Sequence, residues 1–397
     1  MKSIPIILIQ LILIGTFCVT AKAEQETEMT EEAVGAYPDP EQMTEEKPEE
    51  TAEEYLNLTE IQKELEMLTQ TEVFSFTDTV KKLITGEIPF HFEDILPFLF
   101  SLFFSEMNQM RKTALQILII VLSSAVFSNF VRMFENSQIA DISFYAVYLL
   151  ISTMLVRCFS TMNQLVSNTC DSVSAFMKVL LPSYLITVVL SSGTVSALGF
   201  YEITVLAMNL LQLFIIKIIL PSINFYLILL ILNQLSMEEY LSRFAELAET
   251  VIGWTIQSIL GIVLGLQAVQ CLIAPAVDSL KNSSLHQLAK SVPGVGSALD
   301  AAAETVAGSA VVIKNAVGVA GILALLVICL TPILKLSACI LIFRILCAVI
   351  QPFSDRRMVD GIDSISRGSV LLLKTLLTCL AIFIVSLAMI TAAVKGG

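Results

Sequence analysis

Residues 313–350 read IKNAVGVAGILALLVICLTPILKLSACILIFRILCAVI, and their only charged residues are Lys314, Lys335 and Arg344. A helix needs about 20 apolar residues to cross a bilayer, so this run is long enough for nearly two crossings. Pro332 stands near its middle. Proline is tolerated in membrane helices, so it does not by itself separate the run into two spans. The stretch predicts membrane-embedded helix, either as two spans or as one Pro-broken element.

Similar apolar segments occur on both sides of this run. The sequence therefore predicts an all-α, polytopic integral membrane protein with about 7–9 hydrophobic segments, some of them re-entrant or Pro-broken. Several segments are shorter than a full crossing and fit half-helices or merged hairpins. The candidate spans are 113–131, 142–160, 179–198, 204–220, 221–235, 251–273, 313–331, 333–350 and 369–392.

The composition supports this class. The chain has 397 residues, of which 55% are hydrophobic and 15% charged, whereas a soluble protein has roughly 45–50% apolar and 25% charged residues. A soluble multidomain enzyme is therefore excluded. The net charge is −13, but residues 24–54 hold 13 of the 36 acidic residues and one of the 23 basic ones. The rest of the chain is thus nearly neutral.

The N-terminus has the features of an export signal. Ile4 to Val19 is mostly apolar, and Ala21-Lys22-Ala23 matches a signal-peptidase site, which places the mature start at Glu24. An uncleaved first helix is the alternative, although the run is shorter than the ~20 residues of a span. Four regions follow: a signal peptide (1–23), an acidic disordered segment (24–54), extracytoplasmic amphipathic or interfacial helices (55–112) and a multispanning membrane domain (113–397).

Within the third region, apolar residues recur at helical spacing. Leu58, Ile61, Leu65 and Leu68 predict an amphipathic helix. A second short helix is expected to stop at Thr85-Gly86. The apolar stretch 95–104 is too short to span a bilayer and predicts an interfacial or re-entrant segment.

Two parts of the membrane domain share a pattern. Residues 204–235 and 313–350 are each interrupted by a proline, Pro221 and Pro332, and each is followed by a polar link and another apolar helix. This pattern could be an internal repeat of three segments, which would invert the second copy. The simpler explanation is that membrane helices resemble one another.

No catalytic or metal-binding pattern is present in the sequence. His91 and His286 are the only histidines, no C-x-x-C occurs, and none of the usual nucleophile motifs appears. Buried structural thiols are the expected role of the cysteines, with a Cys158–Cys170 disulfide as an alternative. No carboxylate lies convincingly within a span, which argues against coupled transport. We therefore expect no enzyme activity, no cofactor, no metal and no nucleic-acid partner.

Charged residues near small ones mark the candidate functional surface. Burying a charge in hydrocarbon costs at least ~2.5–3.5 kcal/mol, so these side chains must face water, one another or a partner. Simple solvation is the alternative. Gly261 and Gly265 form a G-x-x-x-G that predicts close helix packing. The residues predicted to form a polar cavity or partner contact are Asp300, Glu304, Lys314, Asn315, Arg357 and Asp360.

Several separated motifs resemble one known family. Residues 291–336 (SVPGVGSALDAAAETVAGSAVVIKNAVGVAGILALLVICLTPILKL) contain Lys-Asn-Ala-Val-Gly at 314–318, and the following link carries Asp355, Arg357, Val359 and Asp360. Together with the leader, 83–86 (LITG) and 180–182 (LLP), this order resembles the stage III sporulation protein AE family of endospore-forming Firmicutes. Ala310-Val311-Val312, after Gly308-Ser309, departs from the family pattern, in which leucines often follow.

The resemblance implies a non-enzymatic, multi-pass subunit of the channel or secretion-like complex that joins mother cell and forespore. It would lie in the cell membrane, in the mother-cell-derived outer forespore membrane, beside the other stage III membrane subunits. Its implied role is support of sporulation and late forespore gene expression. A stand-alone secondary transporter or permease with a three-segment repeat is the alternative.

Overall fold

The computed structural model describes residues 58–69, 74–86, 92–132, 137–192, 196–235, 240–289 and 296–393. The chain divides into two compact units, 1–47 and 48–397, and every described residue belongs to the second. The predicted signal peptide and acidic segment lie outside the described residues. The described helices are α3 (Leu58–Thr69), α4 (Phe76–Thr85), α5 (Phe92–Arg132), α6 (Ser137–Ser192), α7 (Ser196–Phe214), the π-helical turn η2 (Ile215–Ile219), α8 (Leu220–Asn233), α9 (Ser242–Ala289), α10 (Gly296–Ile350) and α11 (Arg356–Ala393).

The all-α membrane fold predicted from the sequence is confirmed for the described residues. Six of their helical segments are long and apolar enough to cross a membrane, fewer than the 7–9 hydrophobic segments expected. The difference arises because neighbouring segments fuse into single helices. The six candidates are Leu99–Phe127, Ile142–Val188, Glu202–Asn233, Ser242–Gln270, Ala310–Ile350 and Arg356–Ile390.

The prolines do not break these helices. Pro182 and Pro332 lie inside the continuous helices α6 and α10. At Pro221 the helix instead widens into the π-helical turn, where the Leu220 N–H donates to the Ile215 carbonyl. Proline lacks an N–H and its ring clashes with the carbonyl four residues earlier, which explains the wider turn just before it. Both Pro-interrupted runs therefore stay helical across their proline.

Residues 95–104 also differ from the prediction. They do not form a separate interfacial segment but the first part of α5, which continues without interruption to Arg132. Pro97 lies within this helix. Helical hydrogen bonding satisfies the backbone at any depth, so the short apolar stretch simply joins the next one.

The two short helices form as their spacing predicts. Leu58, Ile61 and Leu65 of α3 are buried, and α3 packs on α6 while α4 packs on α10. Ser75 caps α4 by accepting from the Asp78 N–H at 3.2 Å, and Gly86, with φ of 80°, ends it. Glycine adopts this left-handed conformation without the cost that a Cβ brings.

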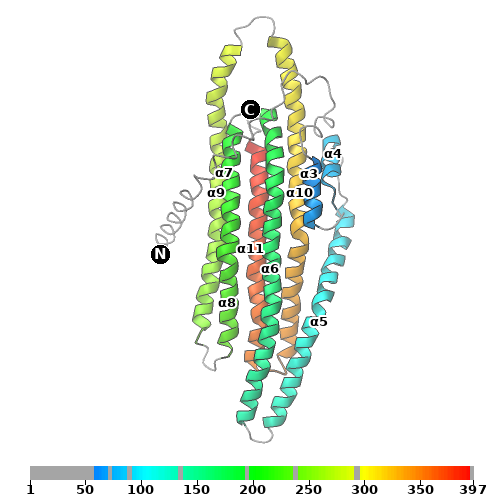
Figure 1. Ribbon diagram of the computed structural model, residues 1–397, viewed down its shortest axis with the longest axis vertical. Coiled ribbons are helices and arrows are strands. Elements are labelled where there is room, and N and C mark those ends of the chain that lie inside the picture. The colour runs from blue at the N-terminus through cyan, green and yellow to red at the C-terminus, as the bar shows by residue number, and fades with distance from the viewer. Residues whose placement is uncertain are drawn as a thin grey trace. The chain divides into compact units, whose positions relative to one another are not determined.

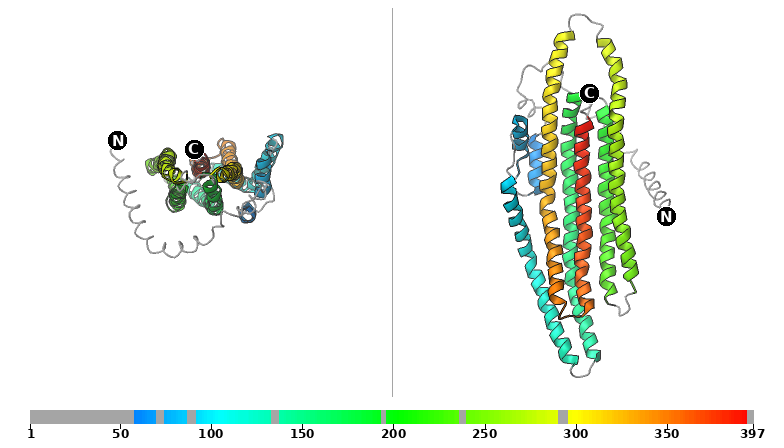
Figure 2. Two further views of the ribbon diagram at one scale, coloured as in Figure 1. Left: turned by 90° about the horizontal axis from the view of Figure 1, so that it is seen from above. Right: turned by 180° about the vertical axis from the view of Figure 1, so that it is seen from behind.

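Helices α10, α11 and α6 form the centre of the bundle, with α5 on one side and α7–α9 on the other (Figures 1 and 2). Glycines let these three helices approach closely. A Cβ at Gly368 of α11 would lie 2.6 Å from Phe159 of α6, and one at Gly361 would lie 2.8 Å from Tyr148. A Cβ at Gly321 of α10 would lie 2.8 Å from Leu180 of α6. Because lipid is as apolar as these side chains, such close packing is what holds membrane helices together.

The direction of the helices excludes an inverted three-segment repeat. Each Pro-interrupted run is one helix, so each proposed repeat contains two long helices rather than three spans. Successive long helices alternate in direction (Figure 1). The hairpin from α7–α8 to α9 therefore points the same way as the hairpin from α10 to α11.

Candidate functional site

The predicted polar residues lie in two groups rather than one. Lys314 and Asn315 are in the first half of α10, whereas Arg357 and Asp360 are in the first turns of α11, beyond the end of α10 at Ile350. At 1.5 Å per residue, the 36 steps from residue 314 to residue 350 span about 54 Å. The two groups therefore cannot share one cavity. Asp300 and Glu304 are also on α10, but their side chains lie outside what the structure describes.

The two residues of the first group differ in exposure. Lys314 is 2% exposed and lies among the core residues Ile313 and Val317, while Asn315 is exposed. Lys314 nevertheless has an interaction partner. A lysine at this burial acts inside the bundle, so of this pair only Asn315 is available to a partner outside the chain.

The second group joins three helices. The Arg357 guanidinium carbon lies 4.3 Å from the centre of the Phe144 ring on α6, a cation–π contact. Phe144 stacks on Tyr148 with ring centres 5.8 Å apart. The Tyr148 hydroxyl donates to the Ile231 carbonyl of α8 at 2.8 Å. Arg357 therefore anchors the start of α11 to α6 and, through two aromatic rings, to α8.

Ion pairs continue along the same part of α11. Arg356 pairs with Asp360 at 3.5 Å, and Arg367 pairs with Asp363 at 2.9 Å. From neighbouring helices, Arg344 donates to Ser366 at 3.1 Å and Tyr226 donates to Glu249 at 2.7 Å. Such a concentration of charge is typical of a membrane–water boundary. We call this set the charged belt: Glu249, Arg344, Arg356, Arg357, Asp360, Asp363 and Arg367.

A carboxylate within a span was missed by the sequence analysis. Glu106 lies in the apolar part of α5, is 8% exposed, and its Oε2 is 3.4 Å from Lys335 Nζ of α10. That oxygen has no hydrogen-bond partner among the described residues, so the contact is electrostatic. The argument from absent carboxylates is therefore wrong. The pair was invisible in the sequence because Glu106 was assigned to the region before the first span.

A second missed feature is one face of α6. From residue 157 to residue 171, exposed polar side chains recur at steps of four, three, four and three residues, and Lys178 follows seven residues later, although the helix is a candidate span. Asp171 accepts from Gln212 of α7 at 2.7 Å, and Gln212 accepts from Ser174 at 2.5 Å. The heptad-like spacing was present in the sequence. We call this set the α6 polar face: Arg157, Thr161, Gln164, Asn168, Asp171 and Lys178.

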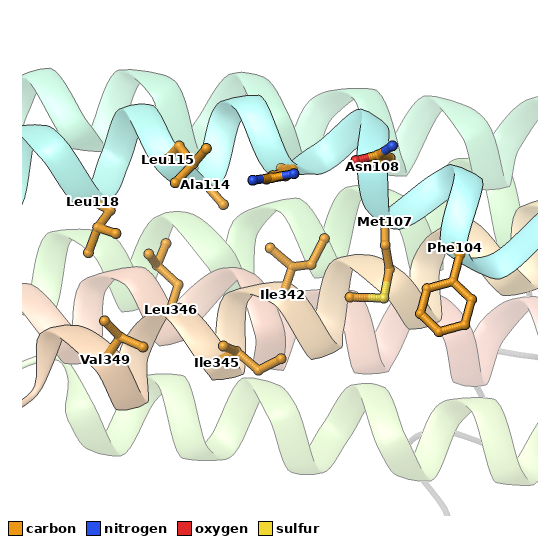
Figure 3. Close-up of a pocket in the computed structure, with 11 residues that line it drawn as sticks. Phe104, Met107, Asn108, Ala114, Leu115, Leu118, Ile342, Ile345, Leu346 and Val349 are labelled. Carbon is orange, nitrogen blue, oxygen red and sulfur yellow. The ribbon is translucent and has the colours of Figure 1, made fainter.

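A groove of about 470 Å³ lies between α5 and α10 (Figure 3). Met107, Leu115 and Leu118 of α5 face Ile342 and Leu346 of α10 across it (Figure 3). The polar side chains of its lining are those of Asn108 and Arg111. Its chemistry suits a hydrocarbon chain rather than a reacting polar substrate.

Gly261 and Gly265 do not make the close contact within the chain. A Cβ at either position would meet nothing within 4 Å, and both residues are exposed on α9. Their role in helix packing stays a prediction for contacts with another chain. The glycines that pack tightly within the bundle are Gly321, Gly361 and Gly368.

The six cysteine side chains that the structure describes are free thiols. Cys158 and Cys170 lie on the same helix, twelve residues or about 18 Å apart, so they cannot form the alternative disulfide. Instead the Cys158 thiol interacts with Cys339 of α10, and Cys170 interacts with Cys379 of α11. No group of three or more His, Cys, Asp or Glu side chains among the described residues could hold a metal ion.

Comparisons with known proteins agree with the motifs. A family model described as stage III sporulation protein AE matches residues 74–394. The stage III sporulation protein AE of Bacillus subtilis (strain 168) is 23% identical over 316 residues, which cover 79% of each chain. No solved structure matches. The match extends from α4 to the end of α11, and the chain therefore belongs to the stage III sporulation protein AE family.

Proposed function

We propose that the chain is a non-catalytic membrane subunit of the channel or secretion-like assembly that connects mother cell and forespore. The observation that supports this most is the family match over all six candidate spans. The chain would lie in the mother-cell-derived outer forespore membrane and support late forespore gene expression. Other membrane subunits of the stage III assembly would be its partners, together with the bilayer.

The turn between α10 and α11 is the surface that we propose for a partner contact. Gln351 and Pro352 are exposed, and Phe353 is 60% exposed at the tip. Next to them, the side chain of Arg356 is 87% exposed while it pairs with Asp360. An aromatic side chain beside an arginine is a common composition for an interface centre. Arg357 and Asp360 would hold this turn in place, and Asn315 would serve a contact near the other end of α10.

Co-purification from sporulating cells tests both proposals. Mass spectrometry of the tagged wild-type chain should identify other stage III membrane subunits, and Arg356→Glu should reduce their yield. Arg243→Glu is the matched control, because Arg243 has the same side-chain exposure of 87% and also belongs to an ion pair on a helix start. Wild-type chain that purifies alone would contradict the function, and equal losses in both variants would contradict the contact.

A stand-alone transporter is the second candidate, and one observation favours it. The Glu106–Lys335 pair within the spans is of the kind that ion-coupled transporters use. Purified chain reconstituted alone into vesicles should then move a solute, and Glu106→Gln should abolish that movement. An inactive preparation that regains function only with other subunits would exclude this candidate.

A further inference from the structure

The α6 polar face spans about one membrane thickness. Its outermost members, Arg157 and Lys178, are 21 residues apart, which corresponds to about 32 Å of helix and matches the ~30 Å hydrocarbon core of a bilayer. Two contacts place its ends in the bundle. Phe159 packs on Gly368, next to Arg367 of the charged belt, and Leu180 packs near Leu387 at the far end of α11. Arg157 and Lys178 thus lie near the two boundaries of the span.

Between these ends, α6 exposes polar groups at a depth where its neighbour exposes leucines. The hydrogen bond from Gln212 to Asp171 fixes the relative height of α7 and α6. On α7, Leu210 and Leu213 flank Gln212 and are 45% and 55% exposed. At this depth α7 exposes leucines where α6 exposes an amide and a carboxylate, and the exposed Lys217 of η2 lies one turn beyond Leu213.

Contact with lipid is energetically unfavourable for this face. A carboxylate such as Asp171 at the depth of hydrocarbon is expensive, and Gln164 and Asn168 add amides that would lack partners there. The charges do not neutralise one another along the helix. Asp171 and Arg157 are 14 residues or about 21 Å apart, and neither forms an ion pair with another described residue.

A dry contact with another helix is also unfavourable. It would remove water from the Asp171 carboxylate and from the amides of Gln164 and Asn168, and desolvating a charge costs more than an ordinary ion pair returns. Water is the environment that satisfies cations, carboxylate and amides together.

We propose that the α6 polar face lines a water-filled path through the membrane for small hydrophilic solutes, completed by other helices of the assembly. This inference rests on the proposed function, because a single chain leaves the face open on one side. The apolar faces of α7 and α9 would then lie toward lipid. Membrane proteins place their polar side chains along ion and solute pathways in the same way.

Thiol labelling in sporulating cells tests the path directly. Gln164→Cys and Asn168→Cys each place a thiol on the face, and Leu213→Cys places one at similar depth on the leucine surface. A charged, membrane-impermeant methanethiosulfonate should modify the first two about tenfold faster or more than the third, because the reactive thiolate forms only in water. The wild-type chain sets the baseline, because its described thiols are buried apart from Cys158, which is half-buried.

Two labelling results would overturn the inference. Labelling of the α6 thiols only by a lipophilic maleimide, at the rate of Leu213→Cys, would place the face in lipid. No labelling by either reagent would place it in a dry protein contact. Co-purification of the same variants separates this test from the proposed function. If the variants retain the other subunits but are not labelled, the water-filled path is refuted and the proposed function is not. If the charged reagent labels a chain that purifies without other subunits, the proposed assembly is refuted.

Discussion

Substitution of Gly368 by alanine is the sharpest test of how α6 and α11 pack. The new Cβ would lie 2.6 Å from Phe159 Cε2, about 1 Å inside the ordinary ~3.5–4.0 Å contact. Overpacking of this kind costs about 1–3 kcal/mol. Alanine also favours a helix over glycine by about 1 kcal/mol, which partly offsets the loss.

Gly265→Ala is the control that removes the propensity effect. It changes the same residue type within a helix, but its Cβ meets nothing within 4 Å. The free energies of unfolding of the two variants should therefore differ by the overpacking cost alone, about 1–3 kcal/mol, with Gly368→Ala less stable. Thermal unfolding of the purified chain in mild detergent measures the difference.

A second substitution makes the test specific to this contact. Phe159→Leu should destabilise the wild-type chain but restore part of the stability of Gly368→Ala, because the shorter side chain leaves room for the Cβ. Equal stability of Gly368→Ala and Gly265→Ala would refute the packing of α6 on α11 at this point. A Phe159→Leu change that adds its full cost in both backgrounds would do the same.

The ion pair between Glu106 and Lys335 predicts that the losses of stability from single and double substitutions are not additive. Glu106→Gln or Lys335→Gln alone should destabilise the chain by less than the ~3–5 kcal/mol of a fully buried pair, because the Lys335 side chain is 29% exposed. The double variant should be more stable than the sum of the singles predicts, and strict additivity in thermal unfolding would argue against the pair. Gly261→Leu with Gly265→Leu should not destabilise the isolated chain, because both positions are open and leucine favours a helix over glycine. The same double change should weaken assembly on native gels, and unchanged assembly would assign both glycines to lipid. N-terminal sequencing of the purified protein should begin at Glu24, and a sequence that begins at the initiator methionine would contradict the cleaved signal peptide.

The all-α membrane class could be predicted from hydropathy alone, because a span needs only length and apolar composition. The number of helices could not. Pro332 separates two apolar segments in the sequence, yet it lies inside the continuous α10. Whether a proline interrupts a membrane helix depends on the neighbours that satisfy the freed backbone groups, and those neighbours come from distant parts of the chain.

The candidate site was predictable only in part. The charge of Arg357 and Asp360 predicts that they lie at the boundary of a span. The contact of Arg357 with Phe144 is not predictable in this way, because it joins residues more than 200 positions apart. The pairing of Glu106 with Lys335 has the same origin. The spacing of the α6 polar face is present in the sequence, but the predicted spans 142–160 and 179–198 leave residues 161–178 outside the membrane helices.

The native mass of the chain in sporulating cells tests the central claim most directly. The chain alone has a mass of 43.4 kDa. Extracted in mild detergent after engulfment and measured by native electrophoresis with mass spectrometry, the tagged chain should run in a complex many times that mass that contains other stage III membrane subunits. A single chain at its own mass, from cells that complete sporulation normally, would contradict the account.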